Sequence, residues 1–233
     1  MAEIVFILYR PGVPGNVGSS ARALKTMGFG ELRLIAPCDY LSDEALMLAH
    51  GSHDILRDAS VFDTFEDAVS DIDFLIGTTS KNRLAKADYL SPSEAFKIVT
   101  GKRDKVGKVA VLFGTEESGL SNDILSRCDV ASTIALKQPY PSLNLSQSVM
   151  LYAYEFSSVV WEAPPLAGID TASYATLKNR VKQLLARVGI PEEMPVYNRI
   201  LERLSFLGAD DINLFHSVTS RVMNALTGKT GKT

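Results

Sequence analysis

The stretch IVFILYRPGVPGNVGSSAR at residues 4–22 contains an apolar run, a loop rich in glycine and proline, and the start of a helical pattern. The uninterrupted apolar run at Ile4–Tyr9 is typical of a strand that is buried on both faces of a parallel sheet. Short apolar runs and helical patterns then alternate along the first 160 residues. This alternation predicts an α/β domain with a mainly parallel sheet.

Apolar runs predict the strands of this domain at Ile4–Tyr9, Leu32–Ala36, Phe74–Gly77, Val109–Phe113 and Val130–Ala135. The helical patterns between them lie at Ser19–Met27, Asp43–Leu48, Phe65–Val69, Ser93–Val99 and Asn122–Ser126. The longest pattern, Asn144–Trp161, is apolar on nearly all sides, which predicts burial on more than one face. That burial is provided either inside one chain or in an oligomer interface.

The sequence APPLAG at residues 163–168 is typical of a linker. We therefore predict an α/β domain at residues 1–163, a linker at 164–170 and a helical extension at 171–233. The helices of the extension are predicted at Thr171–Val188, Glu193–Phe206 and Asp210–Leu226. Residues 171–233 carry 9 basic and 5 acidic groups, against 15 and 22 in residues 1–170. This basic excess indicates either a nucleic-acid contact or an ordinary solvated face.

The composition excludes several classes of protein. With 46% hydrophobic and 22% charged residues, the 233-residue chain is typical of a globular protein and not of a disordered one. It has no run of 18 uncharged apolar residues, so we expect no membrane span. The N-terminus lacks the pattern of a signal peptide. Because Cys38 and Cys128 are too few for a disulfide framework, we expect a reducing, cytoplasmic location.

Three loops that follow predicted strands carry the candidate site, because ligands of open α/β sheets bind beyond the carboxyl ends of the strands. The first loop, Arg10–Arg22, has glycines that allow close approach to a ligand and a helix start that suits an anion. It matches neither a dinucleotide fingerprint nor a P-loop. A plain strand–helix turn with Arg22 on the surface explains this loop equally well.

The second loop, Phe113–Leu120, offers Glu116 and Glu117 as hydrogen-bond acceptors, although both also suit a solvated surface loop. The third loop, residues 138–146, contains Ser142 and Asn144, either of which can cap the helix that follows. Three such loops at the carboxyl ends of strands favour a shared site over three unrelated turns.

In their order and spacing, the three loops resemble the motifs of the SPOUT superfamily of RNA methyltransferases. The resemblance is to the SpoU/TrmH branch, and within it to the TrmJ-type tRNA 2′-O-methyltransferases. It is carried by Pro14–Gly18 with Ala21–Gly28, by Phe113-Gly114 with Glu116 and Gly119–Asn122, and by Ser142–Leu145, and it extends to Gly77–Arg83. The similarity spans residues 3–161, and the helical tail resembles the TrmJ-type extension in size and place.

The resemblance implies a SPOUT-type α/β fold whose C-terminal part forms a deep trefoil knot, and a homodimer with its site near the knot. It implies S-adenosyl-L-methionine as the methyl donor, the ribose 2′-hydroxyl of tRNA as the acceptor, and position 32 of the anticodon loop as the target. Alternatives that stay open are rRNA as the substrate, an RNA-binding protein with weak catalysis, and an unrelated nucleotide-binding enzyme.

The resemblance also implies roles for individual residues. The donor-binding residues would be Thr78, Thr79, Ser80, Gly114, Ile134, Ser142, Leu143 and Asn144. The catalytic set would be Asn16, Arg22, Glu116, Ser142 and Asn144, and the RNA phosphates would contact Arg10, Arg22 and Arg83. Because an arginine side chain keeps its proton, our hypothesis is that Arg22 orients a phosphate and stabilises the developing alkoxide.

Two features of the sequence limit this assignment. TrmJ-type proteins often carry arginine at the positions of Thr115 and Glu117, so the acidic loop of this chain leaves the RNA target open. His50 and His53 lie close together in the sequence, but no third or fourth ligand accompanies them. We therefore expect no metal.

Overall fold

The structure is a computed structural model that describes residues 2–80, 88–138, 142–157 and 173–226. The chain divides into two compact units. The larger unit comprises residues 3–96 and 108–161, and the smaller one comprises residues 1–2, 97–107 and 162–233. Residues 97–107 thus group with the C-terminal helices, although they lie within the sequence range of the predicted α/β domain.

The larger unit contains a sheet of seven strands in the order β3-β2-β1-β6-β4-β7-β5, and every neighbouring pair is parallel. The strands are β1 (Glu3–Tyr9), β2 (Leu32–Ile35), β3 (Ser60–Phe62), β4 (Phe74–Thr78), β5 (Tyr89–Leu90), β6 (Lys108–Phe113) and β7 (Val130–Ser132). The predicted α/β class with a parallel sheet is therefore confirmed.

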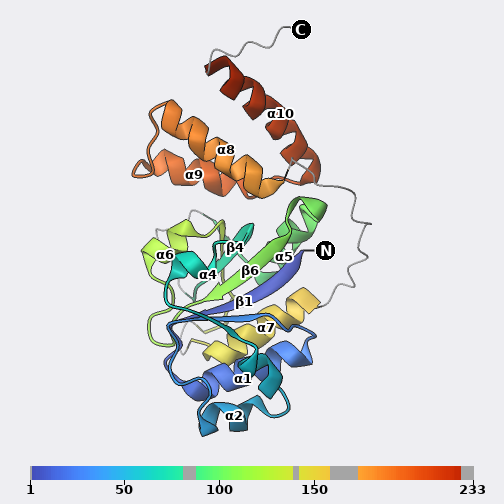
Figure 1. Cartoon of the computed structure of the whole chain (residues 1–233), viewed down its shortest axis with the longest axis vertical. Coiled ribbons are helices and arrows are strands. Elements are labelled where there is room, and N and C mark those ends of the chain that lie inside the picture. The colour runs from blue at the N-terminus through green and yellow to red at the C-terminus, as the bar shows by residue number, and fades with distance from the viewer. Residues whose placement is uncertain (1, 81–87, 139–141, 158–172, 227–233) are drawn as a thin grey trace. The chain divides into compact units, whose positions relative to one another are not determined.

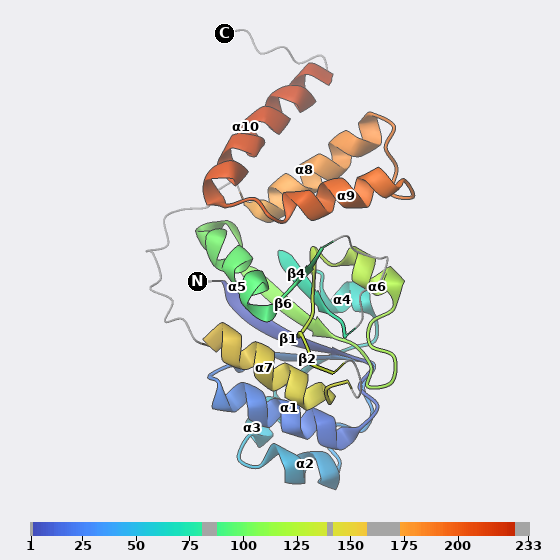
Figure 2. The ribbon, with the colours of Figure 1, turned by 180° about the vertical axis from the view of Figure 1, so that it is seen from behind.

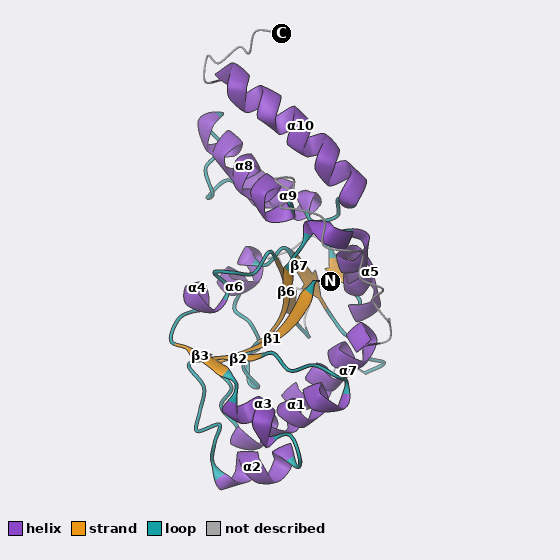
Figure 3. Ribbon diagram, turned by 45° about the vertical axis from the view of Figure 1, so that its right-hand side comes forward, coloured by secondary structure: helices purple, strands orange, loops and turns teal. Residues whose placement is uncertain are grey.

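Helices cover both faces of this sheet (Figures 1 and 2). The helices that begin in the larger unit are α1 (Pro14–Thr26), α2 (Asp43–Ala49), α3 (His53–Arg57), α4 (Phe65–Ala68), α5 (Pro92–Gly101), α6 (Asn122–Arg127) and α7 (Leu145–Ser157). Helix α2 packs chiefly against α1 and not against the sheet. Helix α5 runs from the larger unit into the smaller one. Figure 3 shows α4 and α6 on one side of the strands and α1 and α7 on the other.

Alternate residues of the central strands supply the two cores. Val5 and Leu112 point to the side of α4 and α6, where they join a cluster of buried aliphatic residues. Phe6 and Phe113 point to the opposite side, with their ring centroids 6.3 Å apart. Phe113 meets the ring of Tyr152 from α7 edge-on at 5.4 Å. Because both faces are covered, the strands are apolar throughout, as parallel strands typically are.

Helix α1 begins at Pro14, five residues before the predicted start at Ser19. Proline suits the first helical position, where its missing N–H group has no intrahelical partner to lose. The glycines after it pack against α2, since a Cβ atom at Gly15 would meet Glu44 and Leu48, and one at Gly18 would overlap the Ala45 carbonyl. We expected the glycines of this loop to allow the close approach of a ligand. For Gly15 and Gly18 this is corrected, because they allow the close approach of α2 instead.

Replacing Gly18 by alanine is expected to lower the free energy of unfolding by about 1–3 kcal/mol, because the added methyl group overpacks the contact between α1 and α2. Gly30→Ala is the matched control, because no atom lies within 4 Å of a Cβ at that position. Urea denaturation of both variants measures the difference. Equal stability of the two variants would contradict the packing role of Gly18.

The sequence did not predict three short elements of the larger unit, α3, β3 and β5. Helix α3 has five residues and β5 has two, which is too few to show a periodicity. Strand β7 also ends at Ser132, three residues before its predicted end. Elements of this length are held by their neighbours, as β5 is by its pairing with β7.

The smaller unit contains the short 3₁₀ helix η1 (Arg103–Lys105) and the helices α8 (Tyr174–Arg187), α9 (Pro195–Leu204) and α10 (Ala209–Leu226). Its core includes the cation of Lys102, whose side chain is fully buried. The Lys102 Nζ atom donates to the Leu207 carbonyl at 2.9 Å and lies 4.4 Å from the Tyr174 ring centroid. Arg180 holds α8 to α10 by donating to His216 Nδ1 at 3.0 Å and Ser220 Oγ at 2.6 Å.

Among the described residues, no helix combines the length and the apolar character that a bilayer crossing needs.

Candidate functional site

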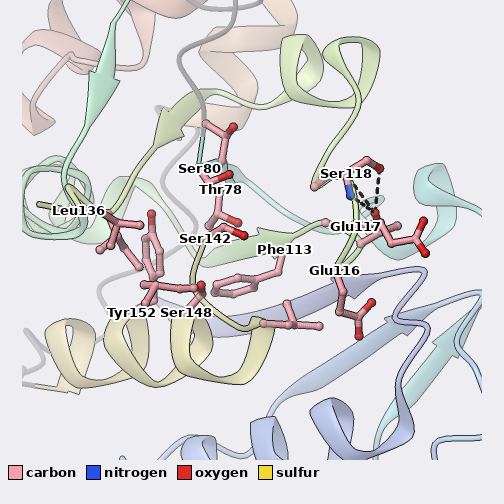
Figure 4. Close-up of a pocket in the computed structure, with 17 residues that line it drawn as sticks. Thr78, Ser80, Phe113, Glu116, Glu117, Ser118, Leu136, Ser142, Ser148 and Tyr152 are labelled. Carbon is pink, nitrogen blue, oxygen red and sulfur yellow. Dashed lines mark hydrogen bonds between the residues drawn. The ribbon is translucent and has the colours of Figure 1, made fainter. Parts of the chain in front are cut away.

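A cavity of about 260 Å³ opens where the sheet meets the start of α7 (Figure 4). Its walls come from the ends of β4 and β6, the segment after β7, and α7. The lining residues are Thr78, Thr79, Ser80, Phe113, Gly114, Thr115, Glu116, Glu117, Ser118, Gly119, Ile134, Leu136, Ser142, Leu143, Leu145, Ser148 and Tyr152. Segments that lie far apart in the sequence therefore form one site at the carboxyl edge of the sheet.

The carboxylate of Glu116 joins the second loop to the first. Its Oε2 atom accepts from the N–H group of Gly12 at 3.0 Å. Its Oε1 atom accepts from the N–H group of Val13 at 3.2 Å and from Asn16 Nδ2 at 3.0 Å. Glu116 thus holds the turn that leads into α1 against the end of β6.

Asn144 extends this network to the third loop. Its Nδ2 atom donates to Asn16 Oδ1 at 2.8 Å. Its Oδ1 atom accepts from the N–H group of Ser146 at 2.8 Å, and its own N–H group donates to Gln147 Oε1 at 3.2 Å. This reciprocal pattern caps the N-terminus of α7. Of the two capping candidates, Asn144 is therefore the one that makes the cap.

Hydrogen bonding keeps Glu116 ionised. Burial raises the pKa of its carboxyl group, but the hydrogen bonds from Asn16 and from the N–H groups of Gly12 and Val13 lower it and prevail, so the pKa lies below its ordinary value of 4.5. A carboxyl group whose pKa is lowered by folding stabilises the native state above its unfolded-state pKa. That contribution is lost as the pH falls below about 4.5 and through the lowered pKa.

Glu116→Gln is expected to lower the free energy of unfolding by about 1 kcal/mol at pH 7, because the amide cannot accept all three hydrogen bonds. The difference from the unmodified protein should shrink as the pH falls below 4.5 and vanish once it has passed the lowered pKa, where the native carboxylate is protonated. Denaturant titrations at pH 7 and at pH 4 or below measure this. A difference independent of pH would contradict the assigned ionisation. Glu117→Gln, on the exposed neighbour, is the control.

The loop after β6 folds tightly back on itself. Thr115 forms an antiparallel bridge with Gly119, whose φ angle of +69° suits glycine. A Cβ atom at Gly114 would overlap the backbone of Gly119 and Leu120. Gly114 therefore makes room for its own loop, which the sequence did not predict, and it also lines the cavity.

Buried polar groups hold the floor of the cavity in place. The phenol of Tyr152 donates to Ser132 Oγ at 2.7 Å, and Ser132 Oγ donates to the Leu90 carbonyl at 2.9 Å. The hydroxyl of Thr78 donates to the Leu112 carbonyl at 2.9 Å. Burial raises the pKa of Tyr152 well above its ordinary value, so the phenol stays neutral and remains a donor. These bonds tie α7 to the strand ends beneath the cavity.

The structure brings together most of the residues that the sequence assigned to the site. Those that line the cavity are Thr78, Thr79, Ser80, Gly114, Glu116, Ile134, Ser142 and Leu143. Asn16 and Asn144 do not line it, but they join its wall through Glu116.

The predicted arginines lie elsewhere. Arg22 is exposed on α1 and is not among the residues that line the cavity. Arg10 is exposed at the end of β1, with a φ angle of +49° that is rare outside glycine, and its guanidinium lies 5.4 Å from the Tyr9 ring centroid. Arg83 lies outside the described residues.

Sequence reasoning missed the cavity residues on α7. Ser148 and Tyr152 stand four positions apart on one helical face, and both line the cavity. The only available signal in the sequence was a serine four positions before a tyrosine in an apolar helical pattern, and core packing explains this pattern equally well. Among the described residues, no three histidine, cysteine or carboxylate side chains gather as a metal site.

The model of the SpoU rRNA Methylase family matches residues 3–154 of this chain. The chain belongs to the SpoU rRNA methylase family. The resemblance seen in the sequence motifs is thereby confirmed. The C-terminal part of this SpoU methylase matches a second model, described as tRNA/rRNA methyltransferase LasT, C-terminal domain, at residues 171–226.

Three similar proteins extend the comparison. The Escherichia coli K12 protein named uncharacterized tRNA/rRNA methyltransferase LasT is 32% identical over 97% of this SpoU methylase and 99% of its own length. The tRNA (cytidine-2′-O-)-methyltransferase TrmJ of Methanocaldococcus jannaschii is 36% identical, covering 65% of this chain and 66% of its own. The crystal structure of TrmJ from Z. mobilis ZM4 superposes with a TM-score of 0.66 at 28% identity, over 95% of this chain and all of that one.

Proposed function

We propose that this chain is an S-adenosylmethionine-dependent tRNA ribose 2′-O-methyltransferase that acts on position 32 of the anticodon loop. The observation that carries the proposal is the single cavity built from the motif-bearing loops, with Glu116, Asn16 and Asn144 bonded into its wall. The similarity to TrmJ proteins supports tRNA as the substrate and the 2′-oxygen as the acceptor atom.

The residues that line the cavity fit the donor. Its volume of about 260 Å³ is slightly below the usual range for small-molecule sites. Apolar side chains such as Leu136, Leu145 and Tyr152 suit an adenine ring, and the hydroxyls of Thr78, Ser80 and Ser142 suit ribose and carboxylate groups. S-adenosylmethionine supplies an activated methyl group on a positively charged sulfur. Residues 78–80, Gly114, Ile134 and 142–144 would hold it beside the entering sugar.

The chain's own residues would then supply positioning and charge. Methyl transfer requires the accepting oxygen, the methyl carbon and the sulfur to lie in line, so fixed orientation contributes much of the rate. Glu116, Asn16 and Asn144 keep the loops in register, and Ser142 at the cavity rim orients the nucleotide. Arg22 would stabilise the negative charge that develops on the 2′-oxygen, and Arg10 and Arg83 would bind neighbouring phosphates.

A homodimer accounts for the position of Arg22. Because Arg22 does not line the cavity of its own chain, we place it at the cavity of a second protomer. Helix α1 packs beside α7, and α7 leaves Leu151 and Tyr154 exposed at 42% and 61%. These apolar side chains would form part of the dimer contact, which would explain why this helix is apolar on nearly all sides. A deep trefoil knot in the C-terminal part of the α/β domain is part of the same proposal.

Methylation of bulk tRNA and of rRNA with a labelled donor, followed by nucleoside mapping, tests the proposal. Label on a 2′-O-methylated nucleoside at tRNA position 32 is the expected result. Label found only in rRNA would show that the substrate is rRNA and would leave the proposed methyl transfer unchanged. Binding of tRNA without any transfer, together with no calorimetric signal for S-adenosylmethionine, would overturn the proposed activity in favour of an RNA-binding protein.

The basic helices would add affinity for RNA through phosphate contacts. Lys182 and Arg187 lie at the surface of α8 and make no ion pair within the described part of the chain. Replacing both by glutamine is expected to weaken tRNA binding and to reduce the slope of log K against log salt by about 2, because each cation releases about one counterion. Filter binding at several salt concentrations measures this. An unchanged slope would exclude these two residues from the RNA contact.

A further inference from the structure

Helix α10 presents two apolar faces, of which α8 covers one. Ala209, Ile212, His216 and Thr219 are buried, and α10 packs against α8 and η1. His216 faces α8, since Arg180 of that helix donates to its Nδ1 atom. A second line of large apolar side chains remains between 42% and 61% exposed. We call it the α10 stripe, and it consists of Leu214, Phe215, Val218, Val222 and Leu226.

Charged residues flank the N-terminal part of the α10 stripe. Asp210 and Asp211 lie in the first turn of the helix, before Leu214, and Arg221 lies between Val218 and Val222. All three are exposed, and none makes an ion pair within the described part of the chain. An apolar line with two acids and one base does not suit RNA, whose phosphates require a surplus of cations. A protein surface of matching pattern is the occupant that this chemistry fits.

Two copies of α10 that run in opposite directions have complementary side chains. Residues 211, 214, 218 and 221 follow the 3-4-3 spacing of a coiled-coil seam. Residues 211 and 221, and likewise 214 and 218, stand at equal distances from position 216. A two-fold axis at that position therefore sets Asp211 against Arg221 of the partner subunit, and Leu214 against Val218 of the partner subunit. A parallel pair would oppose like charges at both ends, which is unfavourable.

We propose that the α10 stripe binds a second copy of this chain, with the two α10 helices antiparallel. At 1.5 Å per residue, the 18 residues of α10 span about 27 Å. A single helix pair of this length is smaller than an ordinary stable interface. The contact therefore acts inside the proposed homodimer, where the larger units already hold two chains together, and it rests on that part of the proposed function.

Disulfide trapping tests the antiparallel arrangement in the full chain. Two variants, Leu214→Cys and Val218→Cys, are co-expressed with tags of different mass in a Cys38→Ser background, since Cys38 is partly exposed and Cys128 is buried. Mild oxidation should link the two variants to each other at least five-fold more than either variant to itself. Links chiefly between identical positions would indicate a parallel pair and overturn the proposal, as would the absence of any linked dimer.

Charge reversal tests the register independently of folding, because both residues are exposed. Asp211→Arg alone, or Arg221→Asp alone, should reduce the yield of linked dimer several-fold, and the double variant should restore it. If the single reversals leave the yield of linked dimer unchanged, the proposed pairing of Asp211 with Arg221 is overturned. If saturating tRNA abolishes the linked dimer, RNA is the occupant of the α10 stripe, and the proposal is also overturned.

The trapping needs neither RNA nor donor. Its failure therefore leaves the proposed methyl transfer standing, and failure of methyl transfer leaves the trapping result readable.

Discussion

Replacing Arg22 by lysine is expected to reduce kcat for methyl transfer by about 100-fold, the loss typical for one preorganised donor to a developing oxyanion. Lysine keeps the positive charge but loses the planar fork, which binds a phosphate and a neighbouring oxygen together. Because Arg22 is exposed and lies outside the cavity, stability and donor affinity should stay unchanged. Single-turnover rates with calorimetry of donor binding separate the two effects.

Arg57→Lys is the matched control, because Arg57 is also an exposed arginine on a helix of the larger unit. It should retain full activity. Near-normal turnover in Arg22→Lys would show that charge alone suffices. A further experiment mixes Arg22→Lys chains with chains that carry Gly114→Ala, whose cavity is defective. Recovered activity in the mixture would show that the arginine acts at the cavity of the other protomer, and no recovery would place it within one chain.

Gly114→Ala is expected to weaken donor binding at least ten-fold and to reduce kcat by about 100-fold, because a displacement of about 1 Å at a reacting centre costs that much. The added methyl group would overlap the backbone of Gly119 and Leu120, so the whole loop has to move. That loop carries Glu116 and lines the cavity. The variant therefore changes the shape of the site without removing any functional group.

Calorimetry with S-adenosylmethionine, and melting curves with and without it, measure this effect. Gly30→Ala again serves as the control, since a Cβ there meets no atom within 4 Å. A Gly114→Ala protein that binds the donor normally would show that the loop tolerates displacement. It would also exclude Gly114 from the donor site.

The sequence predicted the larger unit well where the pattern was long. The five predicted strands form, and because they are parallel, the loops at their carboxyl ends lie at one edge of the sheet. The hydrogen bonds from Asn16 to Glu116 and from Asn144 to Asn16 join residues more than 99 positions apart, so only the motif resemblance indicated them. Local propensity carries no information about such partners.

The errors also have physical reasons. The glycines were explained by ligand approach, whereas Gly18 and Gly114 are required by close backbone packing that only three-dimensional structure reveals. Arg22 was expected one turn into its helix, but α1 starts at Pro14, and this places the side chain further along the helix surface. Tyr152 on α7 gave no polar signal, because its partner Ser132 lies on strand β7.

The order of the sheet determines when the enzyme can first work as it leaves the ribosome. Strand β1 lies between β2 and β6, so the centre of the sheet stays incomplete until residues 108–113 have been synthesised. The bond between Asn144 and Asn16, which are 128 positions apart, forms later still. Contacts of such long range are slow to form. A nascent chain therefore cannot complete the cavity until the residues of α7 have been synthesised, because Ser148 and Tyr152 on that helix line it.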